Sequence, residues 1–146
     1  VPLIFCGPGV PQGLRSEAHC YLLDIYPTLC ELLGVPIPDS VEGKSLVPAM
    51  RDPYELIRDT MYLGYKEYQR GVRDVRFKLI EYVVQGQRTT QLFDIQRDPW
   101  ELDNLATETA HTVEVERLRR ELWRWRDELD DANSEFGRIF WEGFGR

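Results

Sequence analysis

Phe77-Lys78-Leu79-Ile80-Glu81-Tyr82-Val83-Val84 decides the fold, because this run is rich in β-branched and aromatic residues and is followed by turn residues. Similar short runs occupy 61–65, 69–73 and 91–95. Runs of this kind that are separated by turns are typical of strands that pair with their neighbours in sequence. The sequence therefore predicts a four-stranded antiparallel sheet.

An amphipathic helix is expected after this sheet. Apolar residues recur at steps of three and four between about 111 and 131, which places them on one face of a helix. The stripe is too short for a coiled coil, so we expect it to pack on the sheet. Its members are Val115, Leu118, Leu122, Trp125 and Leu129.

The C-terminal tail concentrates aromatic residues behind a polar break at 131–134. Left exposed, such a cluster would form a sticky patch. We expect it to pack either on the domain's own sheet or on a partner surface, which includes a homodimer. The residues concerned are Phe136, Ile139, Phe140, Trp141 and Phe144.

The part of the chain before the sheet predicts one strand and one short helix. Residues 1–6 are an apolar run that predicts a strand, and because the chain opens within it without a Met, we expect a longer protein to precede it. Residues 24–34 predict a short helix, which Asp24 can cap and Gly34 can end. The apolar face of this helix would be formed by Ile25, Leu29 and Leu32 or Leu33.

Composition limits the classes of partner. The chain has 18 Lys and Arg against 25 Asp and Glu, a net charge of −7, which argues against binding to nucleic acid. Its apolar runs fall short of the roughly 18 residues that a membrane span needs, so no membrane partner is expected. The cysteines Cys6, Cys20 and Cys30 have no metal-ligand spacing, and we expect them to be reduced and buried. Their odd number and the absence of glycosylation sequons slightly favour the cytoplasm, but the compartment stays open.

Residues that carry catalytic or metal chemistry are scarce. His19 and His111 lie far apart in sequence, without a second ligand at metal-binding spacing. The carboxylates of Asp24, Asp74 and Asp94 have expected structural duties, which are capping a helix, starting a turn and facing solvent. We therefore assign neither a catalytic residue nor a metal ligand to this chain.

A group of cations stands out in the predicted sheet: Lys66, Arg70, Arg73, Arg76 and Lys78. If the alternation of side chains continues through the turn, Arg70, Arg76 and Lys78 share one face, and Arg73 points the other way. We expect most of these side chains to be solvated and Arg70 to be the one that binds an anion.

Five stretches follow one another in a recognisable order. They are Val1-Pro2-Leu3-Ile4-Phe5-Cys6-Gly7-Pro8-Gly9-Val10, the D-x-x-P-T-L run within 23–34, Gly43-Lys44-Ser45-Leu46, the R-x-V-R and F-K-L-I runs within 70–80, and the L-F-D-I, D-P-x-E and N-L-A runs within 92–106. In this order they resemble the C-terminal part of the sulfatase family, a branch of the alkaline-phosphatase-like superfamily. The tail after Asp131 carries no such signal.

The resemblance implies an α/β fold, which is α+β for the fragment alone. Residues 1–56 would be the end of the large α/β domain, with a strand, the G-P-G loop, a short helix and a connection. Residues 57–146 would be the C-terminal subdomain, with a small four-stranded antiparallel sheet, a packed helix and the aromatic tail. The partner implied is the N-terminal catalytic part of the same protein, and a homodimer through an exposed edge strand or the tail stays open.

Sulfatases hydrolyse sulfate esters with a formylglycine, made from C/S-x-P-x-R, and a calcium ion. Cys6 fits C-x-P-x, but Val10 stands where that pattern requires Arg. The resemblance thus implies calcium and formylglycine for the longer protein, with none in this chain, which alone should be inactive. It also implies Arg70, and more weakly Lys66 and His19, as residues that bind the sulfate-ester substrate. The alternatives are a phosphonate or phosphodiester hydrolase of the same superfamily and a non-catalytic binding module.

Overall fold

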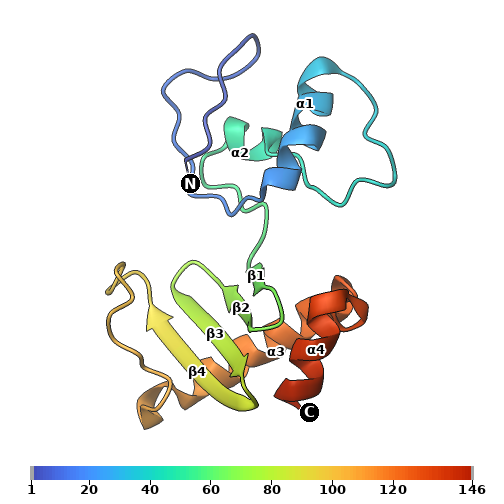
Figure 1. Ribbon diagram of the computed structural model, residues 1–146. Helices are drawn as coiled ribbons and strands as arrows, with labels where there is room; N and C mark the ends of the chain where they lie inside the picture. Colours follow the sequence, from blue (N-terminus) through green and yellow to red (C-terminus); the bar gives the residue numbers. More distant parts are fainter. Residues whose placement is uncertain (1, 146) are drawn as a thin grey trace. The chain divides into compact units, whose positions relative to one another are not determined.

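The computed structural model describes residues 2–145 and divides the chain into two compact units (Figure 1). The first unit is Val1–Asp59 and the second is Thr60–Arg146. The assignment of 1–56 to a larger α/β domain and of 57–146 to a subdomain remains a prediction.

The second unit contains the predicted sheet. Its strands are β1 (Met61–Tyr65), β2 (Gln69–Arg73), β3 (Phe77–Val84) and β4 (Gln87–Asp94). They lie in the order β1-β2-β3-β4, and every neighbouring pair is antiparallel, which confirms the predicted meander. β4 begins earlier than the predicted 91, because Gln85 and Gly86 take positive φ values of 52° and 75° and close a tight hairpin.

Helix α3 (Thr112–Glu128) provides the apolar stripe that the sequence predicted. Val115, Leu118, Leu122 and Trp125 are buried in the core with residues of the sheet. Leu129 is the exception, since the helix ends at Glu128 and this side chain is 46% exposed. The predicted packing of the helix on the sheet is therefore confirmed for the first four positions.

The aromatic tail forms a second helix, α4 (Glu135–Phe144). Phe140, Trp141 and Phe144 belong to the same core as α3 and the sheet, and both helices lie on one face of the sheet (Figure 1). Of the two alternatives for the tail, the structure supports packing on the domain's own sheet. Phe136 and Ile139 stay exposed.

Because of the turn between β2 and β3, the cations that share a face of the sheet differ from those that the sequence predicted. Arg73 lies directly opposite Lys78, and Arg70 lies opposite Glu81. Lys78 therefore shares the face of Arg73, and the prediction that it shares the face of Arg70 is wrong. The reason is local: the carboxylate of Asp74 accepts hydrogen bonds from the backbone N–H groups of Arg76 and Phe77, at 2.7 and 2.6 Å, and this tight turn sets the register.

The first unit is built from short helices and loops. They are η1 (Leu22–Asp24), α1 (Ile25–Leu33) and α2 (Val47–Arg51). The strand expected over 1–6 is not formed by residues 2–6, and residue 1 lies outside the described residues. An extended segment becomes a strand only beside another strand that satisfies its backbone groups, and the described part of this unit contains none. Gly34 ends α1 at a φ of 66°, as predicted.

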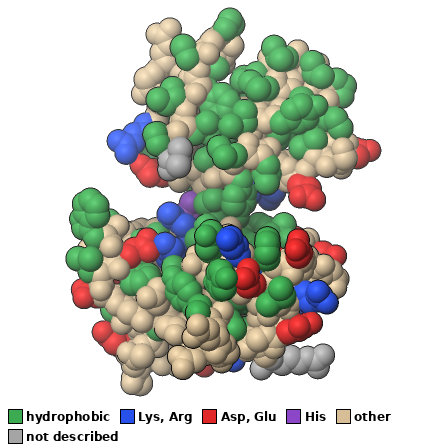
Figure 2. Space-filling model, in the orientation of Figure 1, with side chains coloured by type: hydrophobic (Ala, Val, Ile, Leu, Met, Phe, Trp, Pro, Cys, Tyr) green, Lys and Arg blue, Asp and Glu red, His purple; other side chains and the backbone are tan. Residues whose placement is uncertain are grey.

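Helix α1 buries a different face from the expected one. Pro27, Thr28 and Cys30 are buried; of the predicted positions, Ile25 and Leu32 are partly buried, whereas Leu29 and Leu33 are exposed. Leu22 of η1 and three exposed side chains of α1, Tyr26, Leu29 and Leu33, recur at helical spacing and form an apolar stripe, called the α1 stripe below. Hydrophobic side chains cover much of the visible surface over α1 (Figure 2).

The burial of the cysteines and the hydrophobicity of the helices were also predicted from the sequence. Cys30 is buried, but Cys20 is only partly buried and Cys6 is exposed, so burial of all the cysteines is not confirmed. No helix within residues 2–145 is long and apolar enough to cross a membrane.

Candidate functional site

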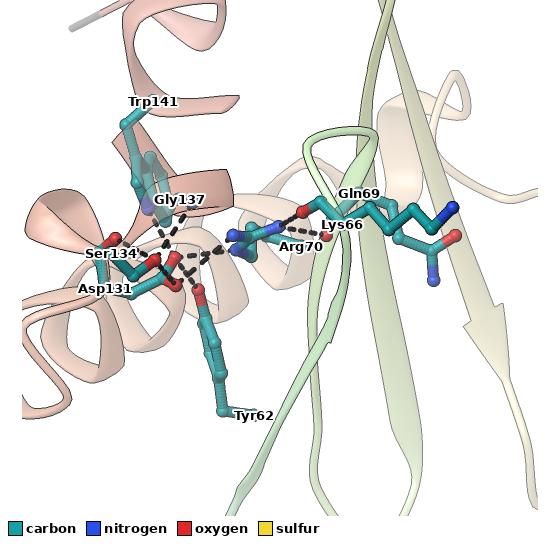
Figure 3. A network of polar contacts seen from close by, with 8 residues as sticks. All are labelled: Tyr62, Lys66, Gln69, Arg70, Asp131, Ser134, Gly137 and Trp141. Carbon is teal, nitrogen blue, oxygen red and sulfur yellow. Dashed lines mark hydrogen bonds and ion pairs between the residues drawn. The ribbon is translucent and has the colours of Figure 1, made fainter. Parts of the chain in front are cut away.

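A buried polar network joins β2 to the C-terminal helices (Figure 3). Arg70 Nε donates to Asp131 Oδ2 at 2.6 Å, and Nη2 donates to Oδ1 at 3.2 Å. Arg70 Nη1 donates to the carbonyl oxygens of Lys66 and Gln69, at 2.5 and 2.8 Å. The guanidinium also lies 5.1 Å from the centre of the Phe140 ring. This set of contacts is called the Arg70–Asp131 network.

Asp131, in η3 (Asp131–Asn133), is the centre of the network. Its Oδ2 accepts hydrogen bonds from Tyr62 Oη at 2.7 Å and from Trp141 Nε1 at 2.8 Å. Burial by itself would raise the pKa of Asp131, but the hydrogen bonds from Arg70, Tyr62 and Trp141 outweigh it and lower the pKa to about 2. Burial and the neighbouring carboxylate raise the pKa of Tyr62. Asp131 is therefore ionised and holds strands and helices together.

The start of α4 is tied to the same network. Ser134 Oγ accepts a hydrogen bond from Gly137 N at 3.0 Å and donates to the carbonyl oxygen of Asp131 at 2.8 Å. A Cβ atom at Gly137 would lie 1.8 Å from that carbonyl oxygen, so a larger residue has no room here. The Asp131-to-Gly137 segment is thus fixed by both polar contacts and close packing.

The candidate substrate-binding residues occupy different settings. Arg70 is 3% exposed and makes the contacts described above. Lys66 is exposed, and its Nζ lies 5.8 Å from the centre of the Tyr65 ring. His19 is buried and belongs to the first unit, whereas the other two residues belong to the second. A substrate role for these residues stays a prediction, and the internal contacts of Arg70 give it a clear structural role as well.

A second network holds the first unit together, and here the sequence prediction needs correction. The side chain of Asp24 is fully buried and does not cap α1. It accepts hydrogen bonds from Tyr21 N at 2.6 Å and Lys44 N at 2.8 Å, and from Arg58 at 2.7 and 2.5 Å. A buried carboxylate requires a charged partner and several donors, and the segment after α2 supplies the guanidinium.

The motif residues near Asp24 also make structural contacts. Thr28 Oγ1 donates to the Asp24 carbonyl oxygen at 2.6 Å and accepts from Leu46 N at 2.9 Å. A Cβ atom at Gly43 would lie 2.2 Å from the Leu23 carbonyl oxygen. The D-x-x-P-T-L and G-K-S-L runs therefore meet because a helix binds the backbone of a loop, and the glycine lets that loop approach.

The motif residues after β4 likewise serve the fold. Asn104 Oδ1 accepts from Leu92 N at 3.0 Å, Asn104 Nδ2 donates to the Thr90 carbonyl oxygen at 3.2 Å, and Leu105 N donates to the Leu92 carbonyl oxygen at 2.8 Å. These contacts occupy the outer edge of β4, which would otherwise offer backbone groups to another strand. Lys78 Nζ binds both carboxylate oxygens of Glu101, at 2.9 and 2.7 Å.

The remaining predicted carboxylates have one confirmed and one corrected role. Asp74 starts the turn before β3, as predicted, and also pairs with Arg117 at 2.6 Å. Asp94 does not face solvent: it is 4% exposed and pairs with Arg76 at 2.8 Å. The hydrogen bond from Arg76 lowers the pKa of Asp94.

Calcium and formylglycine, which the resemblance implies, do not fit the residues of this chain. Within residues 2–145 no three side chains of His, Cys, Asp or Glu lie close enough together to hold a metal ion. Cys6 is exposed, and Val10 stands where the modification motif requires Arg.

Sequence reasoning missed Asp131 and Arg58, the charged partners of Arg70 and Asp24. Ser134 followed by Glu135 at the start of the aromatic run was a usable signal for a capped helix start, but it does not identify Asp131 as a partner of Arg70. Arg58 offered no signal, since a single arginine in a connection does not reveal which carboxylate it pairs with.

The small antiparallel sheet and its two packed helices form a mixed α/β domain, and the motif residues bind its loops and edges. Residues 1–128 match the family model described as N-sulphoglucosamine sulphohydrolase, C-terminal, and the chain belongs to this family. Asp131 and α4 lie beyond the matched residues, which explains why the tail carried no family signal.

Curated proteins and solved structures agree with this assignment. The chain is 32% identical over 123 residues to a Δ4,5-hexuronate-2-O-sulfatase of Bacteroides thetaiotaomicron, and the match covers 77% of this chain and 25% of that protein. A solved 2-O GAG sulfatase superposes with a TM-score of 0.72 at 28% identity, over 88% of this chain and 30% of the other. A phosphonate monoester hydrolase from Silicibacter pomeroyi gives 0.69 at 25% identity, over 84% and 28%. The chain thus spans about a quarter of the length of the curated relative.

Proposed function

We propose that this chain is the non-catalytic C-terminal part of a longer protein that hydrolyses sulfate esters. The observation that carries the proposal is the family match over residues 1–128. One curated relative is a Δ4,5-hexuronate-2-O-sulfatase, and a solved sulfatase shares the fold over 88% of the chain. Calcium and formylglycine would belong to the rest of the protein.

The contacts of the motif residues support a structural role for this part. Asp24, Thr28 and Asn104 bind backbone groups of their own unit, and Arg70 is bound to Asp131. Polar side chains that are bound to the protein's own backbone or to each other stabilise the fold, and few of them remain free to act in catalysis. The partner proposed for the chain is therefore the N-terminal catalytic part of the same protein, with the sulfate ester as that part's substrate.

The α1 stripe supports the same partner. Four large apolar side chains at helical spacing are exposed, one on η1 and three on α1, and exposed patches of this kind mark interaction surfaces. The opposite side of α1 is already bound to the 43–46 loop through Asp24 and Thr28. The stripe is thus the side of α1 that remains for another part of the protein to cover.

The test compares the full-length protein with the 146-residue chain on an aryl sulfate. We expect sulfate release by the full-length protein and none by the chain beyond a metal-free control. Sulfate release by the chain alone would contradict the non-catalytic role. A full-length protein that hydrolyses no sulfate ester would contradict the proposed activity.

A second candidate function is hydrolysis of phosphonate or phosphate esters. The TM-score of 0.69 to a phosphonate monoester hydrolase favours it, because the C-terminal fold is shared by both kinds of enzyme. Comparing kcat/KM of the full-length protein for matched aryl sulfate and phenyl phosphonate esters separates the two. We expect the sulfate ester to be the better substrate.

A further inference from the structure

The two arginines of β2 lie on opposite faces of the sheet and differ in their partners. Arg70 points to the helices and is bound to Asp131, whereas Arg73 lies on the other face of the sheet. The Nε atom of Arg73 is shielded from solvent and has no hydrogen-bond partner among residues 2–145. A guanidinium nitrogen in this state raises the free energy of the folded chain, because burial removes its hydrogen bonds to water and nothing in the described chain replaces them.

The neighbours of Arg73 make its charge less favourable still. Lys78 lies directly opposite on β3, and like charges at directly opposed positions of a sheet repel each other. Lys78 is compensated by Glu101, which it binds at 2.7 Å. Met61 is the neighbour of Arg73 on β1 and offers no acceptor side chain. The negative charge that Arg73 needs is therefore not supplied by its cross-strand neighbours.

Other unpaired cations differ from Arg73 in exposure. Lys44, Arg120 and Arg138 also make no ion pair within the described residues, but all three are exposed and water can solvate them. Arg73 is only partly exposed. The lack of a partner is thus an energetic problem at Arg73 and not at the other three.

We infer that Arg73 binds an oxyanion, a sulfate or carboxylate group, on the face of the sheet away from α3 and α4. The planar guanidinium fork matches the geometry of both groups, and either group would supply the negative charge that Arg73 lacks. Two sources can provide this chemistry. One is an anionic group of the substrate, and the other is a carboxylate side chain in the rest of the protein.

The first experiment uses the chain itself and inorganic sulfate as the probe. NMR follows the Nε–H signals of the arginines while sulfate is added at constant ionic strength. We expect a saturable shift of the Arg73 signal, with affinity at least about tenfold weaker in Arg73→Gln. Arg138→Gln, which removes an exposed unpaired arginine, should leave the affinity unchanged.

Two results overturn the inference. One is an Arg73 signal that does not respond to sulfate in the unaltered chain, a measurement that does not depend on a variant folding. The other is equal sulfate affinity in Arg73→Gln and the unaltered chain. Neither result bears on the proposed sulfatase activity, so the two proposals fail separately.

The second experiment identifies the source of the oxyanion and rests on the proposed function. In the full-length protein, a several-fold rise in KM for the sulfate ester in Arg73→Gln, with an unchanged melting temperature, points to the substrate. A lower melting temperature with an unchanged KM points to a carboxylate of the protein. If Arg73→Gln matches Arg138→Gln in both measurements, neither source binds Arg73 and the inference is wrong.

Discussion

The two units of this chain are stabilised by different physical means. The second unit has a continuous core in which Val72, Leu79, Leu92, Leu118 and Leu122 are completely buried. The first unit exposes the α1 stripe, with Leu22 and Leu33 77% and 75% exposed, and is tied by the ion pair of Asp24 and Arg58. Burial of apolar area is the main favourable term in folding, whereas a buried ion pair contributes little net stability. We therefore expect the second unit to be the more stable of the two, and the first unit to gain stability from a surface that covers the α1 stripe.

Leucine-to-alanine substitutions should show the difference in stability between the two units most strongly. Leu118→Ala removes a fully buried side chain of α3 and should lower the free energy of unfolding by ~2–5 kcal/mol. Leu33→Ala on the α1 stripe should change it by less than about 0.5 kcal/mol. Urea denaturation of the 146-residue chain measures both. Equal losses for the two variants would show that the stripe is already buried in the chain.

Asp131→Asn should be the next largest effect, because it removes the charge that Arg70 binds. The pKa of Asp131 is lowered from 3.8 to about 2 in the folded state, which corresponds to about 2 kcal/mol. A lowered pKa means that this stability is complete above about pH 4 and is lost as the pH falls through 2. The unfolding free energy of the unaltered chain should therefore drop over this range, and that of Asp131→Asn should drop less.

Asp127→Asn is the matched control for this pH dependence. Its side chain is 66% exposed and pairs only with the neighbouring Arg126. Exposed ion pairs contribute little, so this variant should keep the pH profile of the unaltered chain. An identical profile for Asp131→Asn would contradict the role of the network.

Gly137→Ala tests the close packing at the start of α4. The added Cβ would meet the Asp131 carbonyl oxygen, so the helix start must shift, at a cost of ~1–3 kcal/mol. Thermal unfolding followed by tryptophan fluorescence reports it, since Trp141 lies in the same helix. Arg138→Ala, at an exposed position of α4, should leave the melting temperature almost unchanged.

Asn104→Ala should have the smallest effect on stability and a visible one on association. It removes two side-chain hydrogen bonds to the outer edge of β4, at a cost of about 1 kcal/mol. The uncovered edge can pair with another copy, which sedimentation velocity would detect as concentration-dependent dimers. Asn133→Ala removes an exposed side chain elsewhere and should remain at the oligomeric state of the unaltered chain.

Much of the second unit could be predicted from sequence because its elements are locally encoded. The strands 61–65, 69–73 and 77–84 agree residue for residue with the structure, and Val115 to Trp125 form the buried stripe of α3. Alternation and helical periodicity depend on near neighbours, which a sequence displays directly. The start of β4 was missed because residues 87–90 are polar and mostly exposed, so they show no alternation of apolar and polar side chains.

The polar networks could not be predicted, because their partners are far apart in the chain. Arg70 and Asp131 are 61 positions apart, and Asp24 and Arg58 are 34 apart. The face of Lys78 depended on the turn at Asp74, and the buried side of α1 depended on the loop that Asp24 and Thr28 bind. Each of these outcomes is decided by a tertiary contact rather than by local pattern.

Hydrogen exchange of the 146-residue chain tests the contrast between the units most directly. Amides in β2, β3 and α3 should exchange only through global unfolding of the second unit, since their side chains form its core. Amides of α1 should exchange faster by at least about a hundredfold, because the helix opens without disturbing that core. Equal protection of α1 and β3 would contradict the account, since it would show that the first unit is as stable as the second without any further surface.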